Sequence, residues 1–224
     1  MKLKKFEDYI IKEAVGGEET PKRSERILTQ AQKNHEESPG TNGEGSPYIM
    51  PTMVFTDVVE SSKMWSYDPQ TMYVNLEEHH KLVDALSKKY NGWIVKTIGD
   101  AFMVYFNPSK DSFTNALKFC KDVILMEKKY KLRVGLCLGN MEEKTYTIQN
   151  VSLRDFFGNA VNTASRMESK LSPENGLSFT STKPISENTI KDIEENILGV
   201  ELTSVENLDL NGVIVNKAYK AVIK

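Results

Sequence analysis

The spacing of hydrophobic positions divides the chain into a polar N-terminal stretch and a patterned remainder. Residues 15–48 are rich in Gly, Glu, Ser, Pro, Asn and Lys and carry few apolar side chains. Such a composition buries too little surface to offset the entropy of ordering. We therefore predict a short amphipathic helix over residues 1–14, a flexible linker up to residue 48, and a folded domain over 49–224.

Within the folded domain, apolar runs alternate with apolar positions at helical spacing. The runs predict strands at 52–58, 132–139, 177–180 and 213–222, and a hairpin at 93–106. The helical spacings predict helices from about 61 to 90, 109 to 129 and 157 to 171, and another beginning within 182–188 with Pro184 in its first turn. Residues 140–152 are polar and predict a loop or a short hairpin. This order indicates an α+β fold, a ferredoxin-like βαββαβ sandwich with a C-terminal αβ extension.

Composition narrows the functional classes. The formal net charge is −2 and gives no basic excess for nucleic-acid binding. No run approaches the ~20 apolar residues that cross a membrane, and the N-terminus lacks a signal-peptide pattern. Cys120 and Cys137 lie in apolar segments, so we expect buried free thiols. The expected location is the cytoplasm, either for this chain alone or as a soluble domain of a larger or membrane-attached protein.

Two aspartates stand at the ends of apolar strands. Asp57 ends the run 52–57, and Asp100 lies in the Gly99-Asp100 turn of the hairpin. If the strands are neighbours, the carboxylates converge at one sheet edge, where Mg²⁺ would find oxygen ligands. The alternative is that Asp57 caps the next helix and Asp100 merely suits a turn.

A helix face near residue 160 carries further polar groups. Asn162 and Arg166 are four residues apart and share one face, with Asp155 just upstream. Asn can hydrogen-bond a ribose, and Arg can bind phosphate oxygens through its planar fork. The alternative is a solvated helix face.

Several other residues are assigned structural roles. We expect Trp65, Trp93, Met103 and Met167 to pack in the domain. One of His79 and His80 is expected to be solvated and the other partly buried, and Glu127 is expected to be solvated at a helix end.

Three segments, in this order, resemble the catalytic core of class III nucleotidyl cyclases. They are FTDVVESSKMW at 55–65, KTIGDAFMVYF at 96–106 and FFGNAVNTASRMES at 156–169. The first is closest to the bacterial and kinetoplastid-like versions, and the likeness covers about residues 50–222.

The resemblance implies a role for each matching residue. Asp57, Asp100 and the Val58 carbonyl would bind two Mg²⁺ or Mn²⁺ ions per site. The loop with Ser61 and Ser62 would bind the triphosphate. Lys96 and Asp155 would read the base, and this pair is the adenine-reading combination. Asn162 would position the ribose, and Arg166 would stabilise charge on the α-phosphate. The implied reaction converts ATP to 3′,5′-cyclic AMP and pyrophosphate.

The resemblance also implies a homodimer. In this family the metal aspartates come from one subunit, while the base-reading pair, the Asn and the Arg come from the other. The chain departs from the family pattern at Glu60, where a glycine or small residue is usual, and at Asn211, near the place of a phosphate-binding lysine or arginine. Lys217 or Lys220 could substitute for that cation. The alternative function is therefore a catalytically weak, cyclase-like nucleotide-binding or regulatory module that pairs with another cyclase chain.

Overall fold

Strands and helices alternate through the part of the chain that the computed structural model describes, residues 49–224. The helix and linker expected over residues 1–48 lie outside the described residues. The strands are β1 (Thr52–Val58), β2 (Gly92–Ile98), β3 (Ala101–Phe106), β4 (Leu132–Leu138), β5 (Glu142–Ile148), β6 (Val151–Phe157), β7 (Gly176–Ser181), β8 (Thr203–Asp209) and β9 (Ile214–Val222). The helices are α3 (Ser61–Tyr67), α4 (Pro69–Lys89), α5 (Ser112–Met126), α6 (Asn159–Lys170), α7 (Glu187–Asp192) and the π-helical η1 (Ile193–Leu198).

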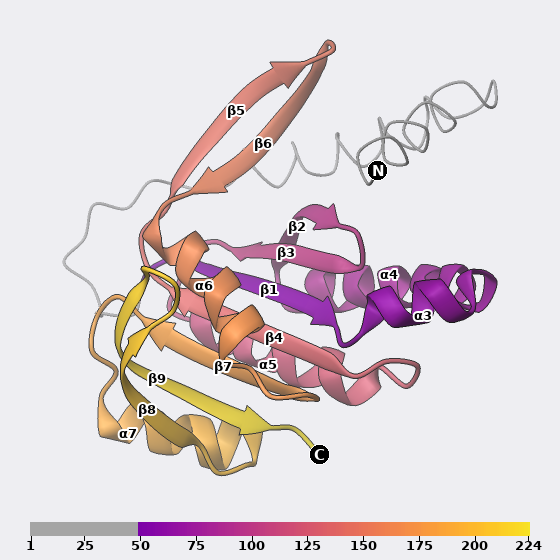
Figure 1. Ribbon diagram of the computed structural model, residues 1–224. Coiled ribbons are helices and arrows are strands. Elements are labelled where there is room, and N and C mark those ends of the chain that lie inside the picture. The colour runs from indigo at the N-terminus through magenta and orange to yellow at the C-terminus, as the bar shows by residue number, and fades with distance from the viewer. Residues whose placement is uncertain (1–48) are drawn as a thin grey trace. The chain divides into compact units, whose positions relative to one another are not determined.

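Seven of these strands form one sheet, in the order β2-β3-β1-β4-β7-β9-β8. All neighbours are antiparallel except β4 and β7, which are parallel. Figure 1 shows α6 crossing one face of this sheet, while α4 and α5 lie against the other. The α+β, ferredoxin-like fold with a C-terminal αβ extension is therefore confirmed.

The two faces of the sheet bury different cores. Alternate residues of β1 separate them: Val54 packs with α4 and α5, whereas Met53 packs beneath α6. The second core also holds Met103, Tyr105, Cys137 and Phe156 with small residues of α6. Cys120 and Cys137 are free and buried, as expected. The helix α6 thus packs closely on the central strands.

Two segments differ in detail from the prediction. The helix expected to begin within 182–188 begins at Glu187, where Ser186 caps it by accepting a hydrogen bond from the Thr189 amide. Pro184 precedes the helix and lies outside its first turn. The sequence shows no apolar run over strand β8, because exposed polar residues dominate it.

The polar segment after β4 forms a hairpin that is longer than expected. Strands β5 and β6 pair with each other and with no other described strand. Figure 1 shows this ribbon projecting from the sheet. Its last residues, Asp155 and Phe156, are buried at the root of the ribbon, next to α6.

A buried hydrogen bond links α4 to the end of α5. His79 Nδ1 lies 2.7 Å from Glu127 Oε2, and both residues are buried. The expectation that Glu127 is solvated was therefore wrong, because α5 ends at Met126 and the chain turns its next side chain inward. The histidine expectation was also wrong, since His79 is buried and His80 is half-buried against Phe102.

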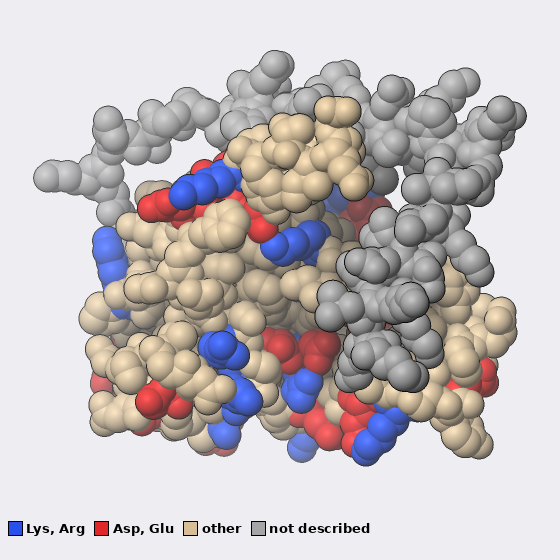
Figure 2. All heavy atoms as spheres, turned by 45° about the horizontal axis from the view of Figure 1, so that its top comes forward, with Lys and Arg blue, Asp and Glu red and all other residues tan. Residues whose placement is uncertain are grey.

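Charged side chains are interspersed over the surface. In the view of Figure 2, acidic and basic side chains lie among each other without separating into two regions. Within residues 49–224, no helix combines the length and the apolar character needed to cross a membrane.

The Glu127 pair makes the fold sensitive to acid. Burial opposes the charged form, but hydrogen bonds from His79 and the Lys129 amide still hold the pKa of Glu127 below its ordinary value of 4.5. A depressed carboxyl pKa stabilises the fold above the unfolded-state pKa, and this contribution is lost as pH falls through the folded-state pKa.

We predict that Glu127→Gln lowers the free energy of unfolding at pH 7 by about 1–3 kcal/mol, the range for a hydrogen bond to a charged group. It should also flatten the decline in stability below pH ~4.5. Urea titrations between pH 3 and pH 8 measure both effects. Glu78→Gln is the matched control, because that carboxylate is exposed, and it should change stability by less than about 0.5 kcal/mol. Equal effects of the two substitutions would contradict the assignment.

Candidate active site

The two aspartates lie at the same end of neighbouring strands. Strand β1 pairs with β3, and the last matched residues are Thr56 and Phe102. Asp57 follows Thr56, and Asp100 lies two residues before Phe102 in the turn that joins β2 to β3. The convergence predicted from the sequence is therefore present.

The turn between β2 and β3 gives Asp100 a semi-buried place. Ile98 pairs with Ala101, so the loop has two residues, and Gly99 at its first position has φ 68°. A positive φ there suits glycine and fits the twist of a tight hairpin. Among the described residues, Asp100 Oδ2 is buried and has no hydrogen-bond partner.

An orphaned, buried carboxylate oxygen beside a second carboxylate fits a divalent cation. Such oxygens are costly to bury without a partner, and Mg²⁺ takes one or two carboxylates together with substrate phosphates. The Val58 side chain is buried at the end of β1. Its residue lies between Asp57 and the loop that leads to α3, which is where a carbonyl ligand is expected.

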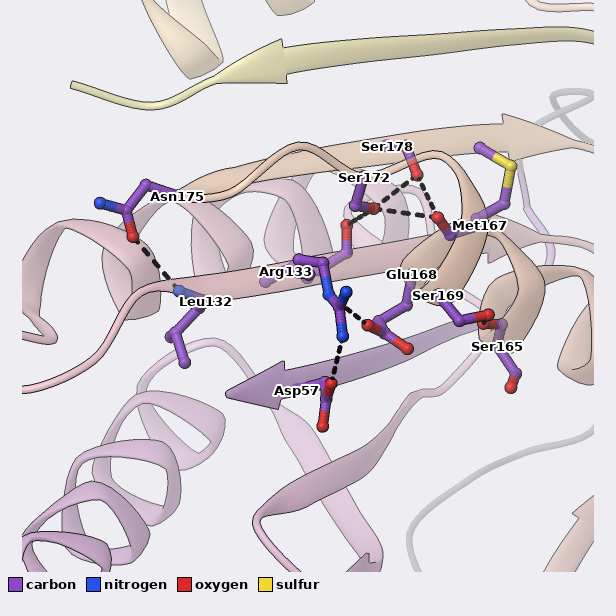
Figure 3. A network of polar contacts seen from close by, with 11 residues as sticks. Asp57, Leu132, Arg133, Ser165, Met167, Glu168, Ser169, Ser172, Asn175 and Ser178 are labelled. Carbon is purple, nitrogen blue, oxygen red and sulfur yellow. Dashed lines mark hydrogen bonds and ion pairs between the residues drawn. The ribbon is translucent and has the colours of Figure 1, made fainter. Parts of the chain in front are cut away.

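Arg133, which the sequence analysis did not predict as a site residue, places its guanidinium next to Asp57. Arg133 of β4 stands directly opposite Asp57 of β1. Its Nη2 donates to Asp57 Oδ2 at 2.6 Å, and its Nε lies 3.2 Å from Glu168 Oε1 on α6. Figure 3 shows the guanidinium between the two carboxylates. The second contact lacks hydrogen-bond alignment, because Arg133 Nε and Glu168 Oε1 both remain without a hydrogen-bond partner in the described chain.

Glu168 reaches this position because α6 approaches β4 closely. A Cβ on Gly135 would lie 2.1 Å from the Glu168 amide nitrogen and 2.5 Å from the Ala164 carbonyl oxygen. Gly135 is two residues from Arg133, on the same face of β4. The missing side chain at Gly135 therefore lets the helix backbone rest on the strand and carries Glu168 over Arg133.

Serine hydroxyls anchor the chain after α6. Ser172 Oγ donates to the Val134 carbonyl at 2.7 Å, and Ser178 Oγ donates to the Met167 carbonyl at 3.1 Å. Both side chains appear beside the C-terminal turn of α6 in Figure 3. These bonds fix the end of the helix that carries Glu168.

The surroundings of Glu168 disfavour its charged form. Burial, followed by the negative charge of Asp57, raises the pKa of Glu168 to about 7, although Arg133 opposes the shift. The charge of Asp100 adds to the increase. Three carboxylates and one guanidinium therefore share this end of the sheet.

Lys96 and Asp155 also come together. Lys96 Nζ forms an ion pair with Asp155 Oδ2, and the Phe156 amide donates to Asp155 Oδ1 at 2.9 Å. Lys96 is half-exposed, whereas Asp155 is buried. Lys96 and Asp155, which the sequence analysis paired only through the family resemblance, are thus in direct contact.

A β-bulge in β2 makes this contact possible. Ile94 pairs with Val104 and Lys96 with Met103, so Val95 is an extra residue. Val104 belongs to the core beneath α4 and α5, whereas Met103 belongs to the core beneath α6. The bulge therefore turns Lys96 to the face where Asp155 lies, although Ile94, two residues earlier, faces the opposite core.

The remaining predicted residues lie at the surface. Asn162 and Arg166 are exposed one turn apart on α6. Ser61 is half-buried and Ser62 exposed in the first turn of α3. Within the described chain, these four residues form no hydrogen bond or ion pair with Asp57 or Asp100.

The two departures from the family pattern have clear local geometry. Glu60 has φ 58°, a conformation that favours glycine, and its exposed carboxylate pairs with Lys63. Asn211 has φ 56° in the turn between β8 and β9. That turn lies beside α6, because Leu210 packs with Met167. Lys217 pairs with Glu206 at 3.3 Å.

The sequence contains a signal for Arg133 and for Glu168, because each is a charged residue at a position where the pattern predicts burial. Arg133 is the one charged residue in the apolar run LRVGLCLG, residues 132–139. Glu168 is four residues after the buried Ala164 and so falls on the buried face of the helix. A charge at a core position is informative because it needs a partner.

Comparisons with known proteins agree with this geometry. The family model described as the adenylate and guanylate cyclase catalytic domain matches residues 46–182. Receptor-type adenylate cyclase B of Leishmania donovani is 43% identical over 53 residues, which is 24% of this chain and 4% of that protein. The receptor-type adenylate cyclase of Trypanosoma equiperdum is 38% identical over 53 residues, 24% of this chain and 11% of that protein. The chain thus matches only a small part of these curated relatives.

Solved structures share the fold. The guanylate cyclase domain of RhGC from Catenaria anguillulae, in complex with GTP, superposes with a TM-score of 0.64 at 22% identity, covering 80% of this chain and all of that one. The adenylyl cyclase CyaB from P. aeruginosa gives 0.63 at 18% identity, covering 77% and 93%. The fold is therefore common to proteins named for either nucleotide.

We predict that Gly135→Ala destabilises the domain by about 1–3 kcal/mol or more, the cost of overpacking a filled interior. The new Cβ would force α6 away from β4. Gly212→Ala is the control, because no atom lies within 4 Å of its Cβ and only its φ of 84° is unfavourable. Chemical unfolding measures both. If Gly135→Ala lowers the free energy of unfolding no more than Gly212→Ala does, the close contact between α6 and β4 is refuted.

Proposed function

Because the chain belongs to the family of adenylate and guanylate cyclase catalytic domains, we propose that it converts ATP to 3′,5′-cyclic AMP and pyrophosphate at sites shared by two copies. The family match extends over more than half of the chain. The observation that carries the choice of ATP is the contact between Lys96 and Asp155. The catalytic domain is assigned to residues 49–224.

The Lys96–Asp155 pair has the polarity that adenine requires. Adenine presents an acceptor at N1 and a donor at its 6-amino group, so the lysine donates and the aspartate accepts. Guanine presents a donor at N1 and an acceptor at O6, which reverses both positions. A site built to hydrogen-bond one base rejects the other, because its polar groups would be left unpaired.

Asp57, Asp100 and the Val58 carbonyl would hold two Mg²⁺ or Mn²⁺ ions. When bound, such ions stabilise the attacking and leaving oxygens of a phosphoryl displacement. The orphaned Oδ2 of Asp100 supports this assignment. The half-buried guanidinium of Arg133, next to Asp57, would bind the phosphates that arrive with the cations.

The ribose and the α-phosphate are assigned to Asn162 and Arg166 of the second copy. Asn162 would hold the ribose so that its 3′-oxygen points at the α-phosphorus. That oxygen gives its proton to solvent water and forms the new bond to the α-phosphorus, while the bond to pyrophosphate breaks and pyrophosphate leaves with the bonding electrons. Arg166 would stabilise the charge that develops on the α-phosphate. Ser61 and Ser62 would bind the triphosphate, and the charge of Glu60 beside them is paired with Lys63.

Two copies are needed because Asn162 and Arg166 do not meet the aspartates of their own chain. We therefore propose a homodimer with two equivalent sites.

The named relatives are receptor-type cyclases. We place this domain in the cytoplasm, where ATP is available, whether or not a longer protein carries it.

One observation favours a second function. Asn211 occupies the turn beside α6 where a cation would bind the terminal phosphates, and Lys217 is paired with Glu206. A chain with such a weakened triphosphate site would act as a nucleotide-binding module that pairs with another cyclase. The assay below separates these functions.

We expect the purified full chain, with Mn²⁺ or Mg²⁺ and ATP, GTP, CTP or UTP in parallel, to make cyclic AMP from ATP. Mass spectrometry identifies the product. Asp57→Ala or Asp100→Ala should reduce activity at least about 100-fold, because each removes a ligand of the metal ions that would stabilise the reacting oxygens. Glu78→Ala, an exposed carboxylate on α4, should retain activity. A main product other than cyclic AMP would refute the base assignment, and no product at all would favour the module.

Mixing inactive variants tests the shared sites. Asp57→Ala and Arg166→Ala should each be inactive alone. After mixing and exchange of subunits, each heterodimer has one site with both defects and one site with neither. Since about half the dimers are mixed, activity should recover to about a quarter of wild type. No recovery, in a mixture shown to exchange subunits, would place both residues in one chain's site.

A further inference from the structure

Arg133 is shared unequally between two carboxylates. It donates to Asp57 at 2.6 Å, whereas its ion pair with Glu168 at 3.2 Å is not aligned as a hydrogen bond. Arg133 Nε and Glu168 Oε1 are both buried without a hydrogen-bond partner in the described chain. A small rotation of the guanidinium would satisfy both atoms.

A cation at Asp57 would compete with Arg133. Asp57 Oδ2 accepts the Arg133 hydrogen bond, so an oxygen that is needed for a metal is occupied by a positive side chain. A divalent ion that binds Asp57 Oδ2 would therefore displace Arg133, and a displaced, half-buried guanidinium needs another acceptor. Among the described acidic groups, Glu168 is the other carboxylate paired with it.

We propose that Glu168 is a positioning residue that takes the Arg133 guanidinium from Asp57 when a divalent cation binds. This inference rests on the proposed role of Asp57 as a metal ligand. Glu168 is suited to the task because the contact of α6 with Gly135 fixes its backbone. The side chain is only 11% exposed, so water competes weakly for its oxygens.

In this arrangement Glu168 affects metal binding through Arg133. With Glu168 present, Arg133 leaves Asp57 without losing a charged partner, and its remaining nitrogens face the phosphates. Without Glu168, Arg133 keeps its bond to Asp57 and opposes the cation. The contribution of Glu168 therefore depends on the presence of Arg133.

The test measures Mn²⁺ binding to the nucleotide-free full chain by electron paramagnetic resonance of the free ion. The proteins are wild type, Asp57→Asn, Glu168→Gln, Glu168→Asp, Arg133→Met and the double variant Arg133→Met with Glu168→Gln. Thermal unfolding and near-ultraviolet circular dichroism confirm that each is folded. Glu168→Asp keeps the charge and shortens the reach, so it remains informative if Glu168→Gln does not fold.

We expect Glu168→Gln to weaken Mn²⁺ binding about tenfold, the scale of one hydrogen bond to a charged group. Glu168→Asp should weaken it several-fold although no charge is lost. In the Arg133→Met background, Glu168→Gln should change the affinity less than about twofold, since the competing cation is gone.

An equal loss of affinity with and without Arg133 would overturn the proposal, because it would show that Glu168 acts only by its negative charge. Unchanged binding in Glu168→Gln would overturn it as well. The Asp57→Asn variant separates this failure from that of the proposed function. If Asp57→Asn binds Mn²⁺ as tightly as wild type, Asp57 is not a metal ligand, and the proposed role of Glu168 is refuted together with that assignment.

Discussion

The contact between α6 and β4 at Gly135 determines where the charged groups of the site lie. A Cβ at that position would lie 2.1 Å from the Glu168 amide nitrogen, so the helix can rest on the strand only above a glycine. This approach puts Glu168 over Arg133, and the pairing of β1 with β4 puts Arg133 opposite Asp57. One missing side chain thus aligns three charged residues that are far apart in the sequence.

The same alignment brings negatively charged carboxylates close together, and their repulsion is unfavourable. Asp57 and Glu168 pair with Arg133 at one end of the sheet. Burial, together with the charges of Asp57 and Asp100, raises the pKa of Glu168 to about 7. One guanidinium cannot neutralise three carboxylates, and like charges held close together are costly. A divalent cation relieves that cost more effectively than a further protein cation would, because it accepts several oxygens at once. The apparent excess of acid is therefore suited to binding metal.

Much of the fold followed from the sequence because local patterns determine it. Strand β1 and the β2–β3 hairpin were predicted nearly residue by residue, since apolar runs and the Gly99-Asp100 turn are short-range signals. Arg133 and Glu168 were not predicted as site residues. Arg133 reaches Asp57 because β1 pairs with β4, and Glu168 reaches Arg133 because α6 packs on β4; no local sequence pattern encodes either contact. Glu127 was assigned to solvent for a related reason, since its partner His79 is 48 residues away. The contact of Lys96 with Asp155 depends on a bulge at Val95, which periodicity does not reveal.

The geometry of α6 is the physical argument for the proposed pairing of two copies. Successive residues are rotated by about 100° around a helix, so Arg166 and Glu168 point in nearly opposite directions. Glu168 is buried toward Arg133 and Asp57, whereas Arg166 is exposed on the outer side. Arg166 thus leaves α6 on the side away from the face that Glu168 turns toward Asp57. If Arg166 stabilises charge at a phosphate held by Asp57 and Asp100, those aspartates must belong to another copy, and dimerisation becomes a condition of the chemistry.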